Sequence, residues 1–403
     1  MNLVKSTDFA ACASGMKRIL CLNAGSSSLK FKLFDLLPSS ILSVVCSGLC
    51  ERIGDASPSR STTNFHVYGD HERVDDVDNA EPFLDHVEAL KRVERYLKSD
   101  LGVDPDDVVA VGHRIVMGRD HDAAVVIDGD VRREIEEGAL LAPLHNPPNL
   151  LGVAAAEVAF PAAMQVAVFD TAFHTTMPDY NKVYALPKKL RDKYKIRKYG
   201  FHGTSYKYLT EQAASRLGKP KPNLILLHLG AGASMCAVKD GRCVDTTMGF
   251  TPTAGLCMNT RSGDVDPSVV AFLVDQEGMT ADQVEAVLNS ESGLFGLCGR
   301  KDMRDVHEAE RRGDRDAKLA KDVYVNRIRC FLGSFFVQLG GQVDAIVFSG
   351  GVGEHDAEIR RRVLDGMEWA GVGTATRVFV IPTDEERSIA QQVVDLLGER
   401  VRS

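Results

Sequence analysis

The sequence predicts an α/β protein built from two similar domains. Its 403 residues exceed what one ordinary hydrophobic core covers. Short apolar runs typical of strands alternate with segments of helical periodicity. A strand, a Gly-rich turn and two further strands occur near the start of the chain and again in its second half. These observations predict two domains of one design that face a central cleft, where ligands commonly bind.

The first Gly-rich turn lies within Leu20 to Asp35, which reads LCLNAGSSSLKFKLFD. The pattern predicts a strand, a tight turn and a second strand. Such a turn can direct backbone N–H groups and serine hydroxyls toward an anionic oxygen, and Lys30 adds a positive charge nearby. The P-loop spacing GxxxxGK[ST] is absent, and the residues after Gly25 alternate like a strand. A purely structural Gly-Ser hairpin is the commoner interpretation of such a stretch, so the other motifs must decide.

The rest of the first half continues the alternation of strands and helices. Strands are predicted at 40–53, 108–116 and 164–169, helices at 83–101, 131–141 and 151–159, and turns at 68–70 and 142–150. The helix at 83–101 is well defined, because its apolar residues recur at helical spacing with charges between them. The prolines and asparagines of APLHNPPNL predict an ordered turn ahead of the helix at 151–159. Asp170 follows the last of these strands, which is either a functional position or a helix N-cap.

The second half repeats the opening design before it becomes mainly helical. Strands are predicted at 223–230, 235–238, 242–247, 345–348 and 377–381, and helices at 267–276, 281–290, 315–339, 358–367 and 384–397. GAGAS forms the second Gly-rich turn, and SGGVGE follows the strand at 345–348. Thr383 or Asp384 is expected to cap the last helix.

Composition excludes several classes of function. The net charge of -8 and the lack of a basic stripe argue against binding to nucleic acid. The nine cysteines are odd in number, form no CxxC and lie mostly in apolar runs, which favours reduced thiols and a cytoplasmic location. No segment resembles a signal peptide or a membrane span. Residues 1–16 are expected to form a disordered extension.

Three cationic side chains stand in Gly-rich loops near strand ends. GHRIV contains Arg114, YGFHGTS contains His202, and TPTAGLCMNTRSGDVDP contains Arg261. Singly, each is more often a surface or structural residue, but such loops give structural Arg and His little to pack against. Two arginines suit a substrate that carries a carboxylate or a phosphate. Phosphoryl transfer between a carboxylate and a nucleotide fits these residue types.

A metal ion would normally accompany such a transfer. Mg²⁺ prefers oxygen ligands and needs only one or two from the protein. Oxygen donors near strand ends are offered by Asn23, Asp170, Glu354 and Glu385. Clusters of zinc-ligand spacing, GxSxG and HExxH are absent, which argues against a zinc protease or a hydrolase elbow.

Together these motifs resemble those of the acetate kinases, in the same order, from about Arg18 to the C-terminus. They are LNAGSSSLKFKLFD, GHRIV, LAPLHNPPNL, FDTAFHTTMP, YGFHGTSYKY, HLGAGAS, MGFTP, TRSGDVDP, FSGGVGE and IPTDEER. The resemblance implies two ribonuclease H-like βββαβαβα domains, as in the acetate and sugar kinase, Hsp70 and actin superfamily. The expected N-terminal domain covers 17–170 plus 384–403 and binds the carboxylate and phosphate. The expected C-terminal domain covers 171–383 and provides nucleotide binding and dimerisation.

The resemblance also implies an activity, which is reversible phosphorylation of acetate by ATP through direct in-line transfer. Mg²⁺, with Mn²⁺ as a substitute, would assist in a cytoplasmic homodimer that yields acetyl phosphate and ADP. The implied catalytic residues are Asp170 as acid or base and His202 and Arg261 as stabilisers of the transition state. Acetate would contact Arg114 and an apolar pocket of Val116, Leu144, Phe201 and Pro252, and the metal would contact Asn23 and Glu385. ATP would contact Lys30, His228, Leu229, Gly230, Ala231, Gly232, Asp302, Met303, Arg304, Gly350, Gly351, Val352, Gly353 and Glu354.

Several positions depart from the usual family pattern. They are Arg119, Tyr206, Ala231, Ala254, Asn259 and His355, where the family usually has Gly, His, Asn, Glu, Gly and Asn. Most flank the expected nucleotide or substrate loops. They leave open whether the chain prefers acetate or propionate and whether ATP or pyrophosphate donates the phosphoryl group. A superfamily member that changes shape for a protein partner is the alternative from another class. Such a protein would not need two arginines and an apolar pocket beside its nucleotide.

Overall fold

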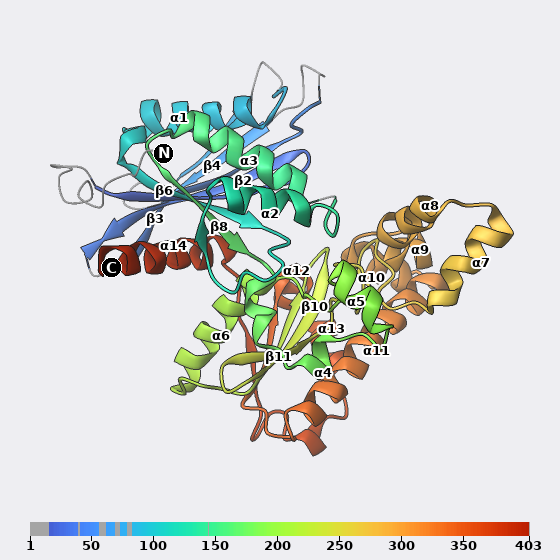
Figure 1. Ribbon diagram of the computed structural model, residues 1–403. Coiled ribbons are helices and arrows are strands. Elements are labelled where there is room, and N and C mark those ends of the chain that lie inside the picture. Colours follow the sequence, from blue (N-terminus) through green and yellow to red (C-terminus); the bar gives the residue numbers. More distant parts are fainter. Residues whose placement is uncertain are drawn as a thin grey trace. The chain divides into compact units, whose positions relative to one another are not determined.

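The computed structural model describes residues 16–38, 41–55, 62–68, 73–78, 83–143 and 145–402. The chain divides into two compact units (Figure 1). Unit 1 comprises Met1–Ala172 and Asp384–Ser403, and unit 2 comprises Phe173–Thr383. All of the expected extension except Met16 lies outside the described residues, as do the predicted turn residues Gly69 and Asp70. None of the helices in the described ranges has the length and apolar character that crossing a membrane requires.

The sheet of unit 1 consists of eight described strands in the order β5-β4-β3-β2-β1-β6-β8-β7. They are β1 (Arg18–Ala24), β2 (Ser28–Leu37), β3 (Ile41–Glu51), β4 (Thr62–Val67), β5 (Arg73–Asp78), β6 (Val108–Ile115), β7 (Val125–Val126) and β8 (Met164–Phe169). The predicted hairpin is present, since β1 and β2 pair antiparallel and Asn23 lies opposite Lys30. β6 pairs parallel with both β1 and β8. The parallel strands therefore direct their C-terminal ends toward one edge of the sheet.

Helices cover both faces of this sheet. They are α1 (His86–Asp100), α2 (Gly129–Gly138), α3 (Asn146–Ala159) and α14 (Glu385–Arg402), with the short 3₁₀ helix η3 (Pro105–Asp107). Because side chains alternate along a strand, Leu20 and Leu22 of β1 pack in the core beneath α1 and α3. Ile19 and Cys21 pack on the other face, against α14 (Figure 1). The last helix of the chain therefore completes the core of the first unit.

The start of α3 corrects one prediction. The sequence predicts a turn over 142–150 and a helix from Leu151, whereas α3 already begins at Asn146. Two prolines stand in its first turn, where a missing N–H costs no helical hydrogen bond. The side chains of Asn146 and Asn149 accept hydrogen bonds from the backbone N–H groups of Met117 and Val116 at 3.0 and 3.1 Å. The motif thus anchors the loop that leaves β6.

The sheet of unit 2 has the order β11-β10-β9-β12-β13. Its strands are β9 (Leu224–Leu229), β10 (Ala233–Lys239), β11 (Arg242–Thr246), β12 (Ala345–Ser349) and β13 (Arg377–Val380). β9, β10 and β11 form an antiparallel meander, and β12 pairs parallel with β9 and β13. Unit 1 has the same arrangement in β3-β2-β1-β6-β8. The duplicated design predicted from the sequence is therefore present in both sheets.

Unit 2 contains more helix than the sequence predicts. Its helices are α4 (Asp179–Lys182), α5 (Lys188–Tyr194), α6 (Gly203–Leu217), α7 (Pro267–Glu277), α8 (Ala281–Ala286), α9 (Gly293–Cys298), α10 (Met303–Arg311), α11 (Arg315–Gln338), α12 (Gly350–His355) and α13 (Ala357–Leu364). Three short helical turns accompany these helices: η4 (Ala172–Thr176), whose first residue belongs to unit 1, η5 (Val287–Glu291) and η6 (Glu368–Ala370). The sequence predicts none of α4, α5, α6, α9, α10 and α12. It also predicts one helix over 281–290, where α8 instead passes into the π-helical turn η5.

Candidate active site

The ends of two neighbouring strands bring Arg114 and Asp170 together in unit 1. Arg114 is the last but one residue of β6, and Asp170 directly follows β8, which pairs with β6. Both Nε and Nη2 of Arg114 donate to Oδ2 of Asp170, at 3.0 and 2.5 Å. The Asp170 side chain is fully buried. Burial works against the charged guanidinium, but Asp170 and Glu385 hold the pKa of Arg114 above its ordinary value.

Two further predicted residues, Asn23 and Glu385, belong to the same group. Nη1 of Arg114 donates to Oδ1 of Asn23 at 3.4 Å. Burial raises the pKa of Glu385, Arg114 opposes that rise, and the negative charges of Asp170 and Glu386 add to it. Among the residues that the structure describes, the Glu385 carboxylate has neither a hydrogen-bond nor an ion-pair partner. The positive charges of Arg114 and Lys30 favour its ionised form without forming an ion pair with it.

Lys30 also lies in this group, paired with an acidic residue of α14. Its Nζ is 2.7 Å from Oε1 of Glu386, and Nζ of Lys32 is 2.7 Å from Oδ1 of Asp384. Burial opposes the charge of Lys30, but Glu386 raises its pKa. The expected ATP contact Lys30 is thus in unit 1, whereas all the other expected ATP contacts are in unit 2.

In unit 2, His202 and Arg261 converge on the second Gly-rich turn. A Cβ added at Gly232 would lie 3.6 Å from Nη1 of Arg261 and 3.7 Å from Nε2 of His202. His202 precedes α6 in the left-handed region, at φ 61°. Its Nδ1 is 2.8 Å from Oγ of Ser234, and its ring stacks on His228 with centroids 4.4 Å apart. Strand β10, which carries Ser234, therefore orients the imidazole whose other nitrogen is near Gly232.

A cavity of about 790 Å³ in unit 2 lies beside the same turn. Seven of the expected ATP contacts line it, namely Gly230, Ala231, Asp302, Met303, Arg304, Gly351 and Val352. Asn259 and His355, two of the positions that depart from the family pattern, line it as well. Its size is typical of a site for a nucleotide-sized molecule.

Five further residues line this cavity that the sequence motifs do not predict. They are His307, Arg311, Asp356, Ala357 and Glu358. His307 and Arg311 belong to α10, whose buried Met303, Val306 and Ala309 recur at helical spacing. That periodicity could have revealed the helix, although not which of its side chains line a cavity. Asp302 begins α10 as its N-cap, and the hydrogen bonds from Arg304 lower its pKa to about 2.

The remaining expected ATP contacts support the loops around the cavity instead of lining it. Gly350 has a φ of 76°, and a Cβ there would lie 2.8 Å from the carbonyl carbon of Leu229. Oε1 of Glu354 accepts from the backbone N–H groups of Gly350 and Thr383, at 2.9 and 3.3 Å. Nδ1 of His228 is 2.9 Å from Oγ of Ser205. Leu229 and Gly353 are buried.

The expected methyl pocket draws on residues of both units. Val116 is buried in unit 1, Phe201 is buried in unit 2, and Pro252 is half-buried in unit 2. Leu144 lies outside the described residues. The pocket remains a prediction.

Comparison with known proteins gives one consistent family. The family model described as the acetokinase family matches residues 18–392. The acetate kinase of Streptomyces avermitilis is 44% identical over 405 residues, which cover 94% of this chain and 98% of that protein. The crystal structure of Porphyromonas gingivalis acetate kinase is similar with a TM-score of 0.84 and 37% identity, and the match covers 94% of this chain and 100% of that one. A propionate kinase structure from Francisella tularensis matches with a TM-score of 0.83 and 38% identity over 94% of this chain and 99% of that one.

Proposed function

Because the chain belongs to the acetokinase family, we propose that it catalyses the reversible transfer of a phosphoryl group from ATP to acetate, giving acetyl phosphate and ADP. The observation that carries the proposal is the convergence of His202 and Arg261 on Gly232, next to the nucleotide-sized cavity. Unit 1 supplies the groups that bind the carboxylate, and unit 2 supplies those that bind the nucleotide.

Arg114 is the group that binds acetate. A guanidinium has five N–H donors, and Asp170 accepts from two of its nitrogens, Nε and Nη2. Donors therefore remain on Arg114 for a carboxylate. Acetate is already anionic and has no proton to lose, so Asp170 acts as a positioning residue for Arg114 instead of as a base.

His202 and Arg261 stabilise the charge that develops during transfer. The transition state of phosphoryl transfer spreads negative charge over three equatorial oxygens, and catalysis is mostly positioning and electrostatic stabilisation. The imidazole Nε2 of His202 and the guanidinium of Arg261 both lie near Gly232, where they can meet that charge. Arg304, Arg311 and His307 line the cavity where the nucleotide phosphates would lie.

The residues of unit 1 fit the Mg²⁺ ion that the family implies. Glu385 offers a carboxylate to which no described residue donates a hydrogen bond, and the amide oxygen of Asn23 lies in the same group through Arg114. Carboxylate and amide oxygens are the ligands that hard cations such as Mg²⁺ and Mn²⁺ prefer. When bound, the ion would neutralise charge on the phosphate oxygens. Asn23 and Glu385 would hold it.

The direct test is acyl hydroxamate formation from carboxylate, ATP, Mg²⁺ and hydroxylamine. We expect activity with acetate and a steep fall beyond three carbons when formate, acetate, propionate and butyrate are compared. His202→Ala should abolish the signal, while Arg216→Ala, a change in the last turn of α6, should keep it. No hydroxamate from any of the four acids would reject the function, and equal rates with butyrate would reject the small apolar pocket.

Propionate is the second candidate substrate, because one similar structure is that of a propionate kinase. The same acyl series decides between the two, since the preferred acid has the higher kcat/KM. Pyrophosphate is an alternative donor, because Ala231, Asn259 and His355 all line the cavity. The cavity volume favours ATP. A higher kcat/KM with pyrophosphate than with ATP would reverse that assignment.

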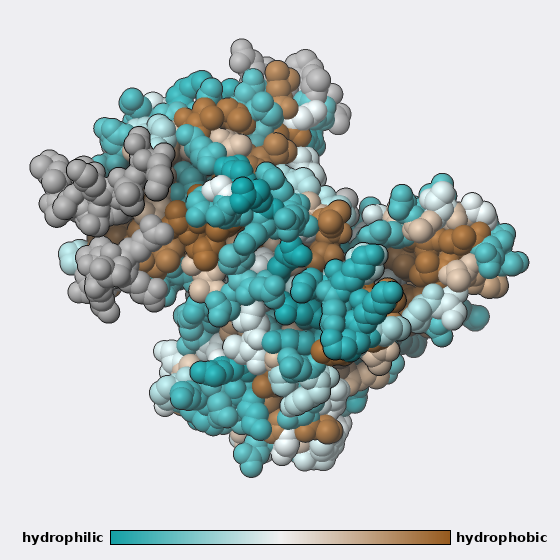
Figure 2. Space-filling model, in the orientation of Figure 1, coloured by the Kyte–Doolittle hydropathy of each residue, from teal (hydrophilic) through white to brown (hydrophobic). Residues whose placement is uncertain are grey.

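The proposal includes a homodimer formed through unit 2. Helix α7 has no buried residue, and Phe272 in it is 63% exposed. Hydrophobic side chains gather on the surface in the part of the molecule where α7 lies (Figure 2). Sedimentation should give a dimer for the wild type and a monomer for Phe272→Asp, whereas Val158→Asp, at an exposed site of unit 1, should stay dimeric. A monomeric wild type would contradict this.

The proposed location is the cytoplasm. The eight described cysteines are all free thiols, as expected where disulfides do not persist. Acetate, acetyl phosphate, ATP and ADP are the proposed small-molecule partners. Neither nucleic acid nor membrane is proposed as a partner.

A further inference from the structure

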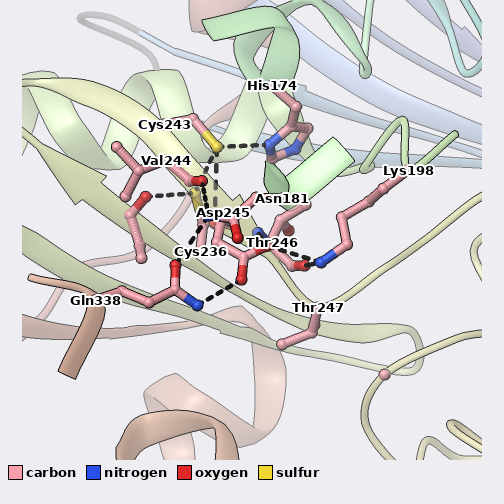
Figure 3. A network of polar contacts seen from close by, with 12 residues as sticks. His174, Asn181, Lys198, Cys236, Cys243, Val244, Asp245, Thr246, Thr247 and Gln338 are labelled. Carbon is pink, nitrogen blue, oxygen red and sulfur yellow. Dashed lines mark hydrogen bonds and ion pairs between the residues drawn. The ribbon is translucent and has the colours of Figure 1, made fainter. Parts of the chain in front are cut away.

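A second group of chemically active side chains lies in unit 2, outside the proposed active site. It consists of His174 in η4, Cys236 in β10 and Cys243 in β11 (Figure 3). Their ligand atoms, the imidazole Nδ1 and the two Sγ atoms, all lie within 4.8 Å of one another. All three residues are buried, with 1% exposure for His174 and 0% for both cysteines. We propose that these residues form a binding site for a thiophilic metal cation, Zn²⁺.

The distances fit a metal bound between the three atoms. Zinc binds thiolate at about 2.3 Å and imidazole nitrogen at about 2.1 Å, so tetrahedral geometry separates two sulfurs by about 3.8 Å and sulfur from nitrogen by about 3.6 Å. The two Sγ atoms are 3.5 Å apart, and Nδ1 of His174 is 3.2 Å from Sγ of Cys243. Shifts of a few tenths of an ångström would admit the ion.

The backbone brings the two sulfurs to the same place. β10 and β11 are antiparallel neighbours, and their register shifts between Ala237 and Val238, so that Cys243 pairs with Val238 and Thr246 with Cys236. Side chains two positions apart on a strand share a face. Cys236 and Cys243 therefore lie diagonally on one face, the face that His174 covers (Figure 3).

The imidazole of His174 is oriented as a metal ligand requires. Its Nε2 is 2.8 Å from the backbone oxygen of Phe201. A carbonyl oxygen can only accept, so the proton is on Nε2 and the lone pair is on Nδ1, the atom that faces the thiols. A metal-bound histidine typically donates its other N–H to such an oxygen, which fixes the tautomer. The hydrogen bond that a zinc-bound histidine makes through its other ring nitrogen is thus already in place.

The charge balance also suits a buried ion. Zn²⁺ with two thiolates and a neutral imidazole has no net charge, and binding releases the two thiol protons. The nearby charges of Asp245 and Lys198 already compensate each other, with Nζ of Lys198 2.7 Å from Oδ1 of Asp245 (Figure 3). By contrast, the group of His307, Glu310 and Glu358 surrounds the ammonium of Lys321, which pairs with both carboxylates. That group therefore already holds a cation.

The site lies directly behind the proposed catalytic histidine. His174 donates to the carbonyl of Phe201, the residue before His202. Ser234, which contacts His202, precedes Cys236 by two residues on β10. A bound ion would tie β10, β11 and the segment before α6 together, and would thereby position His202. This consequence rests on the proposed function, whereas metal binding itself does not.

The test measures metal content of the full-length protein, independently of activity. Protein purified under reducing conditions without chelators should contain about one zinc ion per chain. The zinc content is measured by inductively coupled plasma mass spectrometry. X-ray absorption at the zinc edge should show two sulfur ligands at about 2.3 Å. Cys243→Ser and Cys236→Ser should each lower the zinc content at least tenfold. Cys257→Ser, which alters another buried cysteine outside the group, should not change it.

Two results would overturn the site, and neither depends on the variants remaining folded. The first is wild-type protein that contains no zinc and gains none when refolded with one equivalent of Zn²⁺ under reducing conditions. The second is an absorption spectrum in which the bound zinc has only nitrogen and oxygen ligands. Kinase activity in zinc-free wild type would leave the proposed function standing and show that His202 does not need the ion. Zinc with two sulfur ligands in an inactive protein would support the site and reject the proposed function.

Discussion

At the scale of single residues, the pair of Arg114 and Asp170 shows how two strand ends can form the proposed carboxylate site. A flexible arginine alone would lose conformational entropy on binding a ligand. Here the buried Asp170 holds two nitrogens of the guanidinium, so its orientation is fixed before the substrate arrives. The pair also explains why a carboxylate follows β8, a position that the sequence leaves divided between a functional residue and a helix N-cap.

Asp170→Asn tests whether Asp170 positions Arg114 or acts as a base. Losing the charge leaves Arg114 misoriented, so KM for acetate should rise and kcat/KM should fall by a factor of about 10². Breaking a buried pair should also lower the free energy of unfolding by about 3 kcal/mol. Glu137→Gln, which breaks the exposed pair with Arg119, is the matched control and should change neither quantity. A lower kcat with an unchanged KM for acetate would instead favour a base.

His113 makes the stability of unit 1 depend on pH. Burial lowers its pKa to about 4, from 6.5, and Nε2 lies 2.7 Å from Oε1 of Gln165. The unfolded chain takes up the proton below pH 6.5 while the folded chain resists it. Stability is therefore retained above about pH 6.5 and lost progressively down to about pH 4, by about 3 kcal/mol in total.

The measurement for His113 is the free energy of unfolding between pH 7 and pH 4. The glutamine in His113→Gln cannot take up a proton. The free energy of unfolding of this variant should therefore fall much less between pH 7 and pH 4 than that of the wild type, whatever its value at pH 7. Identical slopes for the two proteins would show that His113 does not cause the acid sensitivity.

At the scale of elements, the strands were the most predictable part of the chain. β8 has the predicted bounds, and the two hairpins with Gly-rich turns are present, because apolar strands bounded by Gly carry a local signal. The helices near the proposed active site carry a weaker local signal in the sequence. His202, the left-handed N-cap residue, precedes α6, and α12 begins at Gly350 within SGGVGE. A helix that starts at a glycine or after a left-handed residue resembles a loop in the sequence, because its formation depends on tertiary contacts.

The site residues show the same contrast: those in sequence motifs were predictable, and those placed by tertiary packing were not. The motifs placed Asp170, His202 and Arg261 near strand ends and Gly-rich turns, where the structure has them. The sequence did not place His307 or Arg311, because which face of α10 lines the cavity depends on its packing against α11. Nor did it reveal that Glu354 accepts from the backbone of Gly350. Hydrogen bonds from a side chain to a distant or turn backbone leave no periodic signal.

Gly350→Ala tests the close approach at the start of α12. Alanine would be strained at φ 76°, and its Cβ would overlap the backbone of Leu229. We expect the thermal midpoint to fall and the Kd for ATP, measured by calorimetry, to rise at least tenfold. Gly333→Ala in α11, where a Cβ meets nothing within 4 Å, is the matched control and should stabilise by about 0.5 kcal/mol. A Gly350→Ala protein with wild-type ATP affinity would contradict the role assigned to this turn.

At the scale of the whole molecule, the chain uses one sheet design twice, and we propose a different ligand for each copy. In unit 1, the groups at the ends of β1, β6 and β8 suit a carboxylate and a hard cation. In unit 2, the turn between β9 and β10 borders the nucleotide-sized cavity. The chain returns to unit 1 at Asp384, so Glu385, the first residue of α14, joins the first group from the far end of the sequence. In the proposed reaction, the required groups are therefore divided between the two units.

The central claim is that both units contribute to one phosphoryl transfer, and the most direct measurement follows the reaction in reverse. Acetyl phosphate, ADP and Mg²⁺ are mixed with the protein, and ATP is recorded as light from luciferase. We predict ATP formation by the wild type and a loss of at least about 10³ in kcat/KM for Arg114→Ala in unit 1 and for Arg261→Ala in unit 2 alike. ATP formation that persists at the wild-type rate in either variant would contradict the claim.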